Sequence, residues 1–347
     1  MNKKADHLHP GLLIASAILV FTILACVFSR KTILPVGIST ETSGSVSTAL
    51  SNTNSSRAPT DAVIPSVTNE ASLSETYLGD ANQESGYAVT ALKVADPATP
   101  IFINYTAKAG MKLVAVDVVI SNISGESLYA TPRDVDLLDS NNLTYQNEID
   151  AVDNSFNPVA LNPGEQEEGW ISYTIPETAA PVHLQYSNEL LGNAVIKVSL
   201  APPPAGHQPV VISLAHTLPT TKLGDVVTKY GYSMAAKALD DPAQPVAGYE
   251  TREGYKIVAV ELVLNNISST APLDLNSYNI FLVDDKGFVY WSDGSVAENE
   301  LPIGNLNIGG TAQGWITFPI PQGAKPVYIK YETQNLSGDF LITGLTK

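Results

Sequence analysis

The chain has 347 residues, 44% of them hydrophobic, which is enough for two folded domains and further segments. Its formal net charge of -16 at pH 7 argues against nucleic acid as a partner, because phosphate binding needs clustered lysine and arginine. The single cysteine, Cys26, lies in the apolar N-terminal stretch, so we expect no internal disulfide and no catalytic thiol.

After a tail of residues 1–10, the stretch 11–28 is uncharged and mostly apolar. As a helix, these 18 residues would span roughly 27 Å, close to the ~30 Å of a bilayer core. Basic residues lie on both sides of the stretch, so charge alone does not set its orientation. We expect a single-pass anchor in the cell membrane, with the folded domains on the extracytoplasmic side.

A lipoprotein signal is the alternative for the same stretch. Ile23-Leu24-Ala25-Cys26 resembles a lipobox, with Cys26 as the residue to be acylated. Leu24 fits that motif poorly, and Val27 and Phe28 continue the apolar run. We favour the uncleaved anchor, in which Cys26 is a small apolar residue of the helix.

Residues 29–71 are rich in serine and threonine and lack apolar periodicity. Such a composition cannot bury enough apolar surface to fold. The sequence therefore predicts a disordered, flexible linker between the membrane segment and the first domain.

An internal repeat is the strongest signal in the sequence. Segments that match at an offset of 145 residues include Gly86-Tyr87 with Gly231-Tyr232, Asp96-Pro97 with Asp241-Pro242, and Gly169-Trp170 with Gly314-Trp315. Each copy has the size of an independent domain. We predict one domain over residues 72–200 and a second over residues 218–347.

The intervening residues 201–217 begin with the proline-rich sequence Ala-Pro-Pro-Pro-Ala. Linkers rich in proline are extended and semi-rigid. We therefore expect this interdomain linker to hold the two domains apart.

Alternation of apolar and polar residues, with a period of two, dominates each copy. Val114, Val116, Val118 and Ile120 form one apolar face, and Asp117 lies on the other, as in a half-buried strand. The expected strands of the first copy are 87–94, 114–120, 135–138, 170–175, 182–186 and 195–200, and those of the second copy follow at the same spacing. About seven short strands separated by turns predict an all-β fold, with each copy an antiparallel β-sandwich.

The order of motifs resembles a known family. An apolar strand runs into Asn122-Ile-Ser, a strand ends in Asp139 before a turn and Tyr145, and Leu161-Asn-Pro-Gly precedes Gly169-Trp-Ile. This order resembles the bacterial immunoglobulin-like domain-of-unknown-function family of lipoproteins and secreted proteins, which is similar to the secreted mycobacterial immunoprotective antigen. The resemblance covers residues 73–200 and 218–347. It implies two immunoglobulin-like sandwiches and no shared catalytic residues.

Catalytic chemistry finds no support in the sequence. His183 and His216 have no metal-ligand partners at suitable spacing, and no nucleophile elbow or phosphate-binding glycine loop is present. We therefore expect a protein that is not an enzyme.

Carboxylates are the most abundant polar groups, and one cluster comprises Asp134, Asp136, Asp139 and Asn141. A Ca²⁺ site needs six to eight converging oxygens, often from such loops. The second copy does not repeat the cluster, because Phe281 stands where Asp136 does. We favour solvated turns and expect no cofactor, with Ca²⁺ as the alternative.

Trp170 and Trp315 occupy the same position in the two copies, on the strand face opposite the apolar one. An outward aromatic can anchor a protein or a glycan. The alternative, which we favour, is that a loop or neighbouring strand covers each ring.

Together these features predict a membrane-anchored, non-enzymatic surface protein whose two modules contact an envelope protein or a glycan. A structural spacer without a specific ligand is one alternative. A calcium-stiffened adhesion module is another.

Overall fold

The computed structural model describes residues 76–101, 107–148, 151–188, 191–192, 194–246, 248–267, 271–293, 298–333 and 338–347. All of these described residues belong to one compact unit. The expected membrane segment 11–28, Cys26 and the linker 29–71 lie outside the described residues. Among the described residues, no helix is long and apolar enough to cross a membrane.

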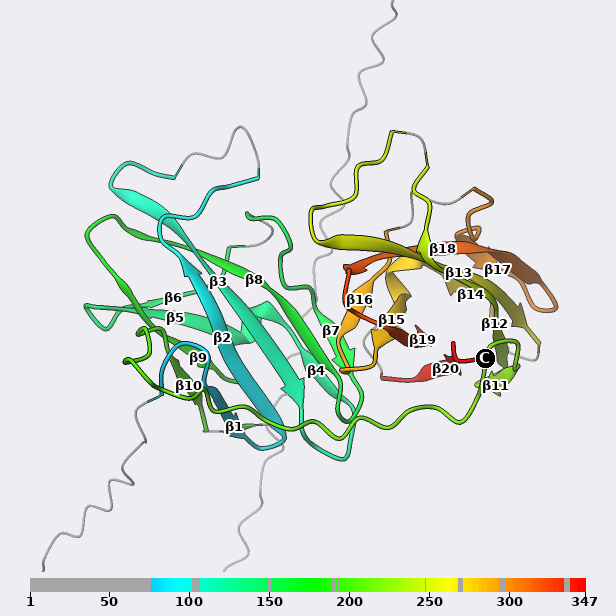
Figure 1. Cartoon of the computed structure of the whole chain (residues 1–347), viewed down its shortest axis with the longest axis horizontal. Coiled ribbons are helices and arrows are strands. Elements are labelled where there is room, and N and C mark those ends of the chain that lie inside the picture. Colours follow the sequence, from blue (N-terminus) through cyan, green and yellow to red (C-terminus); the bar gives the residue numbers. More distant parts are fainter. Residues whose placement is uncertain are drawn as a thin grey trace, which may run out of the picture. The chain divides into compact units, whose positions relative to one another are not determined.

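In the described residues, strands β1 to β10 build the first sandwich. Figure 1 shows their arrangement. They are β1 (Ala81–Glu84), β2 (Tyr87–Ala95), β3 (Met111–Asn122), β4 (Leu128–Ala130), β5 (Val135–Asp139), β6 (Thr144–Tyr145), β7 (Val159–Leu161), β8 (Gln166–Pro176), β9 (Pro181–Tyr186) and β10 (Ile196–Ser199). One sheet has the order β1-β2-β3-β8, the other has the order β10-β9-β5-β6, and β4 pairs with β7. A short 3₁₀ helix, η1 (Pro132–Asp134), precedes β5.

The second sandwich repeats this plan. Its strands are β11 (Val227–Lys229), β12 (Tyr232–Ala243), β13 (Tyr255–Asn266), β14 (Leu273–Leu275), β15 (Ile280–Asp284), β16 (Val289–Trp291), β17 (Gly304–Leu306), β18 (Thr311–Pro321), β19 (Pro326–Glu332) and β20 (Phe340–Gly344). The sheets have the orders β11-β12-β13-β18 and β16-β15-β19-β20, with β14 paired to β17. The 3₁₀ helix η3 (Ser277–Asn279) precedes β15. The predicted all-β fold with two repeated sandwiches is confirmed.

The central strand β3 has both faces buried. Val114, Val116, Val118 and Ile120 point into the core, as predicted. The opposite face was expected to be solvated, and this expectation is wrong, because Asp117 and its neighbours are also buried. A small outer cluster of Leu113, Ala115, Ala151 and Val152, with Trp170 packed against it, covers that face.

An aspartate closes the same turn in both copies. Asp139 Oδ1 accepts hydrogen bonds from the backbone N–H groups of Asn141 and Leu143, at 2.8 and 2.9 Å. Its Oδ2 accepts from the Tyr145 hydroxyl at 2.9 Å. Asp284 has the corresponding bonds in the second copy. The Asp-to-Tyr motif is therefore a turn that stabilises the fold.

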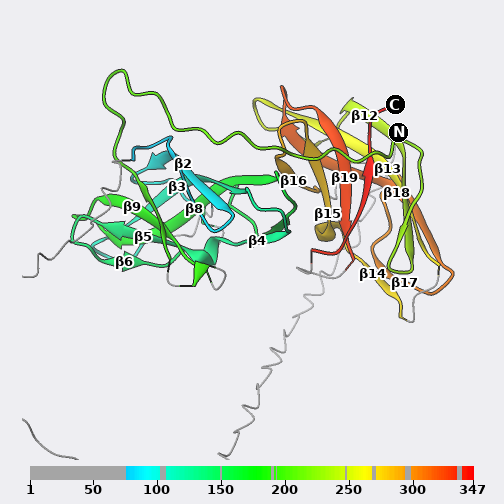
Figure 2. The ribbon, with the colours of Figure 1, turned by 90° about the horizontal axis from the view of Figure 1, so that it is seen from below.

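The proline-rich linker does not hold the sandwiches apart. It lies along the first sandwich (green trace, Figure 2), where the Ala201 carbonyl accepts from the N–H of Leu78 at 2.8 Å. His207 Nε2 lies 2.8 Å from Asp80 Oδ1, and the Val210 N–H donates to the same oxygen at 2.8 Å. The composition predicts an extended linker that holds the domains apart. Instead, linker residues bind the buried Asp80 carboxylate of the first sandwich.

Removal of the Asp80 carboxylate tests the contact between the linker and the first sandwich. We expect Asp80→Ala to lower the free energy of unfolding by about 1–3 kcal/mol, because it removes the acceptor of the hydrogen bonds from His207 and from the Val210 N–H. Asp225→Ala is the matched control, since Asp225 keeps the local turn bond from Lys222 N–H but is exposed. Urea unfolding measures stability, and limited proteolysis within 201–217 measures release of the linker. Equal effects of the two variants would contradict the contact.

Candidate binding site at the seam between the sandwiches

The two sandwiches share a continuous apolar contact, here called the seam. Phe281, Val283, Val289, Tyr328 and Phe340 of the second sandwich belong to the same buried cluster as the first sandwich's core. The expectation of two spaced domains is therefore wrong, because apolar side chains of β15, β16, β19 and β20 are buried against the first sandwich.

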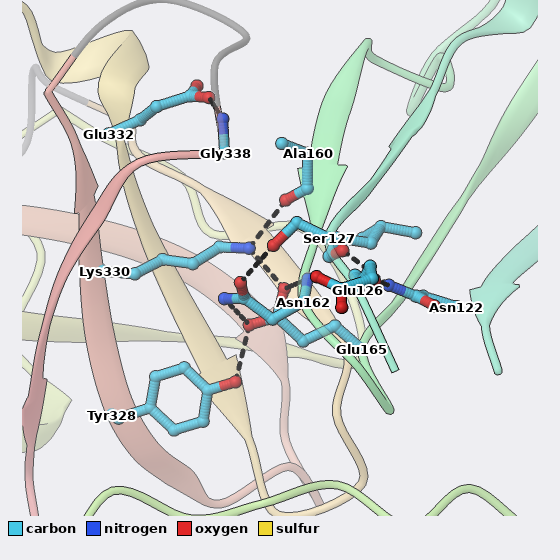
Figure 3. A network of polar contacts seen from close by, with 11 residues as sticks. Asn122, Glu126, Ser127, Ala160, Asn162, Glu165, Tyr328, Lys330, Glu332 and Gly338 are labelled. Atoms are coloured by element: carbon cyan, nitrogen blue, oxygen red, sulfur yellow. Dashed lines mark hydrogen bonds and ion pairs between the residues drawn. The ribbon is translucent and has the colours of Figure 1, made fainter. Parts of the chain in front are cut away.

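A buried ion pair lies at the centre of the seam (Figure 3). Lys330 Nζ donates to Glu165 Oε2 and to the Ala160 carbonyl, and both charged side chains are 0% exposed. The Tyr328 hydroxyl donates to Glu165 Oε1 at 2.6 Å, and Asn162 donates its backbone N–H and its side-chain amide to the same carboxylate. This set of donors satisfies the Glu165 carboxylate in a site without water access.

Each half of the ion pair belongs to a different copy of the repeat. Gly310 stands where Glu165 does, and Gln185 stands where Lys330 does. Neither sandwich therefore contains both partners of the pair. The pair forms only across the seam, which distinguishes the two otherwise similar modules.

A second carboxyl group, Glu167, is buried beside the pair. Burial raises its pKa well above the usual glutamate range, although the Lys330 charge and the nearby Trp291 indole lower it in part. Glu167 Oε2 and Trp291 Nε1 are both buried without a well-formed hydrogen bond in the described part of the chain. One lysine thus faces two seam carboxyl groups, of which Glu167 carries the raised pKa.

The raised pKa of Glu167 makes stability depend on pH. The unfolded chain releases this proton near pH 4.5, whereas the folded chain retains it to higher pH, so stability falls as pH rises above that value. We expect Glu167→Gln to remove this part of the decline and to be more stable than wild type at pH 8. Unfolding curves from pH 4 to pH 9 measure the effect, with Glu253→Gln as an exposed control. A decline unchanged in Glu167→Gln would contradict it.

The backbone of the Gly-Trp motif forms hydrogen bonds with a neighbouring segment. The Trp170 N–H donates to the Asn154 carbonyl at 2.8 Å, and the Phe156 N–H donates to the Trp170 carbonyl at 2.9 Å. Asn154 takes a left-handed conformation, with φ 56°. A Cβ added to Gly169 would lie 2.6 Å from the Phe156 Cα, so glycine is needed at that position.

The second copy repeats this arrangement. Trp315 exchanges backbone hydrogen bonds with Asn299 and Leu301, and Asn299 again has a positive φ, of 58°. A Cβ on Gly314 would lie 2.6 Å from the backbone of Glu300. A neighbouring segment thus covers part of each tryptophan, which leaves both rings half-buried.

A hollow lies beside each tryptophan, at the same place in the two copies. The hollow of the second sandwich, about 330 Å³, is lined by Leu275, Ser277, Glu300, Leu301, Pro302, Ile303, Trp315 and Ile316. The residues of the first sandwich at the equivalent positions Pro132, Ser155, Phe156, Asn157, Pro158, Trp170 and Ile171 also line a hollow. The duplicated fold therefore builds this hollow twice.

The hollow of the first sandwich is larger, about 650 Å³, because the second sandwich completes it. Its lining from the second sandwich comprises Asn276, Tyr278, Asn279, Phe281, Trp291 and Glu332. We call this site the seam hollow. The Trp291 ring packs edge-on against Phe281, with centroids 4.9 Å apart. Concave sites of this size, mostly apolar with a few polar groups, are typical of ligand binding.

The sequence identified only part of this site. Trp170 lines the seam hollow and Trp315 lines the smaller one, so the two predicted rings lie in separate hollows. Tyr278 was missed, because Arg133 stands at its position in the first copy. The structure identifies Tyr278 by its exposed fraction of 65%, which cannot be read from the sequence.

The acidic cluster does not converge in the described residues. Asp134 lies in η1 before β5 and lines the seam hollow, whereas Asp139 closes the turn at the other end of that strand. Asn141 contacts Asp139, and burial raises the pKa of Asp136. No three His, Cys, Asp or Glu side chains of the described part are grouped to hold a metal ion.

The calcium alternative has a simple test. Because hydrogen bonds within the turn occupy both Asp139 oxygens, we expect chelation to leave the melting temperature unchanged. Thermal unfolding in 1 mM EGTA and in 1 mM CaCl₂ measures this. A rise in melting temperature with calcium that disappears in Asp136→Asn would instead support a calcium site.

Comparison with known proteins gives a family. Residues 77–196 and 221–339 each match the family described as "Domain of unknown function (DUF4352)". The secreted protein MPT63 of Mycobacterium tuberculosis is similar, with 16% identity, coverage of 38% of this chain and 99% of that chain, and a TM-score of 0.31. The yjhA protein of Bacillus subtilis is similar with 19% identity, coverage of 36% and 99%, and a TM-score of 0.29. No curated protein matches the chain.

Proposed function

Because this chain belongs to the DUF4352 family, whose description assigns no activity, we propose its function from the seam. We propose that it is a non-enzymatic binding protein on the extracytoplasmic side of the membrane, tethered through residues 11–28. The contact site is the seam hollow, whose lining includes Tyr278 and Trp291.

One observation carries the binding proposal. The hollow beside the Gly-Trp motif occurs in both sandwiches, and only at the seam is it enlarged by side chains from the other module. Tyr278 lines it and is 65% exposed, although it is a large aromatic residue. Tyrosine and tryptophan in concave sites supply most of the binding energy of many interfaces.

The test is retention of an envelope component by the immobilised full chain. We expect a component that binds wild type and is lost with Tyr278→Ala, which removes an exposed ring without touching the core. Ile303→Ala is the matched control, since Ile303 is 73% exposed and lines the smaller hollow of the second sandwich. Retention that does not depend on Tyr278 would refute the seam hollow as the contact site.

A structural spacer is a second candidate, and the buried Glu165–Lys330 pair supports it, because it links the two modules through a dry interface. The spacer predicts that no envelope component depends on Tyr278. The retention experiment therefore separates the two functions.

The membrane tether is tested by fractionation of cells. We expect the full chain in the membrane fraction, and Cys26→Ser to remain there, because the apolar run itself is the anchor. Release of Cys26→Ser into the soluble fraction would support the lipoprotein alternative.

A further inference from the structure

We propose that the seam hollow binds an uncharged oligosaccharide, which names a ligand class for the proposed function and rests on it. Three features of the lining support this: aromatic faces, amide groups with free hydrogen-bonding capacity, and a negative balance of charge.

The aromatic faces come from both sandwiches. Tyr129, Phe156 and Trp170 of the first sandwich and Tyr278 and Trp291 of the second line the hollow. A pyranose ring presents apolar C–H faces bordered by hydroxyl groups. Tyrosine and tryptophan combine an apolar face with a polar group in the same way, so their rings are suited to stack on a sugar.

The amide groups are the second feature. Asn147 and Asn279 line the hollow and are half-buried, and their side chains make no hydrogen bond to any other described residue. An asparagine amide donates through nitrogen and accepts through oxygen. It can therefore pair with a sugar hydroxyl, which also donates and accepts.

The charge of the lining separates neutral from anionic ligands. Asp134, Glu148 and Glu332 line the hollow, and Arg133 is the one basic residue among the described lining. The whole chain is also acidic, at -16. Like charges oppose an anionic ligand, so uronic acids and phosphate-bearing polymers are disfavoured.

The hollow favours a saccharide over a peptide for a geometric reason. Much of its lining comes from the 3₁₀ helices η1 and η3 and from residues 155–158, which lie outside the strands and offer no sheet edge. Extended peptides are usually recognised by backbone pairing along a sheet edge. A ligand recognised by rings and amides alone fits this lining better.

The experiment titrates the full chain, in a detergent without a sugar headgroup, with maltotriose, cellotriose and triacetylchitotriose. Calorimetry measures binding, and tryptophan fluorescence reports on Trp170 and Trp291 in the hollow. We expect at least one trisaccharide to bind and trigalacturonate not to bind. Tyr278→Ala should weaken binding at least tenfold, and Asn279→Ala should weaken it severalfold.

Ile303→Ala in the smaller hollow is the matched control and should bind like wild type. No binding of any trisaccharide at millimolar concentration would overturn the inference. So would binding that is unchanged in Tyr278→Ala. If saccharides fail while an envelope protein is retained through Tyr278, the proposed function stands and its ligand is a protein. If retention also fails, both are wrong.

Discussion

Lys330→Met should lower the free energy of unfolding by about 3–5 kcal/mol, because it leaves the Glu165 carboxylate buried and unpaired. The remaining donors, Tyr328 and Asn162, are neutral and cannot replace the ammonium charge. Urea unfolding of wild type and variant, followed by circular dichroism, measures the difference.

Two controls isolate the charge from the packing. The double variant Glu165→Leu with Lys330→Met should recover most of the loss, because apolar pairs often replace buried ion pairs without cost. Gln185→Met changes the equivalent strand position of the first sandwich and should stay within about 0.5 kcal/mol of wild type. If Lys330→Met were as mild as Gln185→Met, the ion pair would not stabilise the seam.

Asn122→Ala should lower the free energy of unfolding by about 2–4 kcal/mol. The Asn122 amide donates to the carbonyls of Glu126 and Leu161, both at 2.7 Å, and its oxygen accepts from Ser124. Alanine removes all of these bonds at the end of β3. The bond to the Leu161 carbonyl is buried, and loss of a buried partner costs about 1–3 kcal/mol. The measurement is again urea unfolding.

The repeat supplies a replicate for this prediction. Asn266 has the same role in the second copy, where it donates to Ala271 and Leu306, so Asn266→Ala should give a similar loss. Asn141→Ala, at an exposed turn, should change stability by less than about 0.5 kcal/mol. Similar effects of Asn122→Ala and Asn141→Ala would show that the buried network is not a stabilising feature.

Features shared by the two copies could be predicted from the sequence. The predicted strand 114–120 lies within β3, and the predicted strand 170–175 lies within β8, because alternation of apolar residues reports the buried face directly. The short strands β1, β4, β6 and β7 were not predicted, since two to four residues are too few to show a period.

Features that belong to one copy could not be predicted. Glu165 and Lys330 read as ordinary surface charges, and nothing in their spacing of 165 residues indicates that they meet. The seam hollow also needs both sandwiches, because Tyr278 and Trp291 of the second sandwich are part of its lining. Trp170 could be predicted because the repeat places Trp315 at the same position. The residues of the second sandwich that enlarge its hollow have residues of other types at the equivalent positions of the first copy.

The central claim is that the seam makes the binding site, and charge reversal at its centre tests this most directly. Lys330→Glu places a third acidic group beside Glu165 and Glu167, and like charges in a buried site repel strongly. The measurement is retention of the envelope component by immobilised Lys330→Glu and wild type, with circular dichroism to show that the β-sandwiches remain folded. The account predicts that folded Lys330→Glu loses retention. Retention equal to wild type in the folded variant would contradict it.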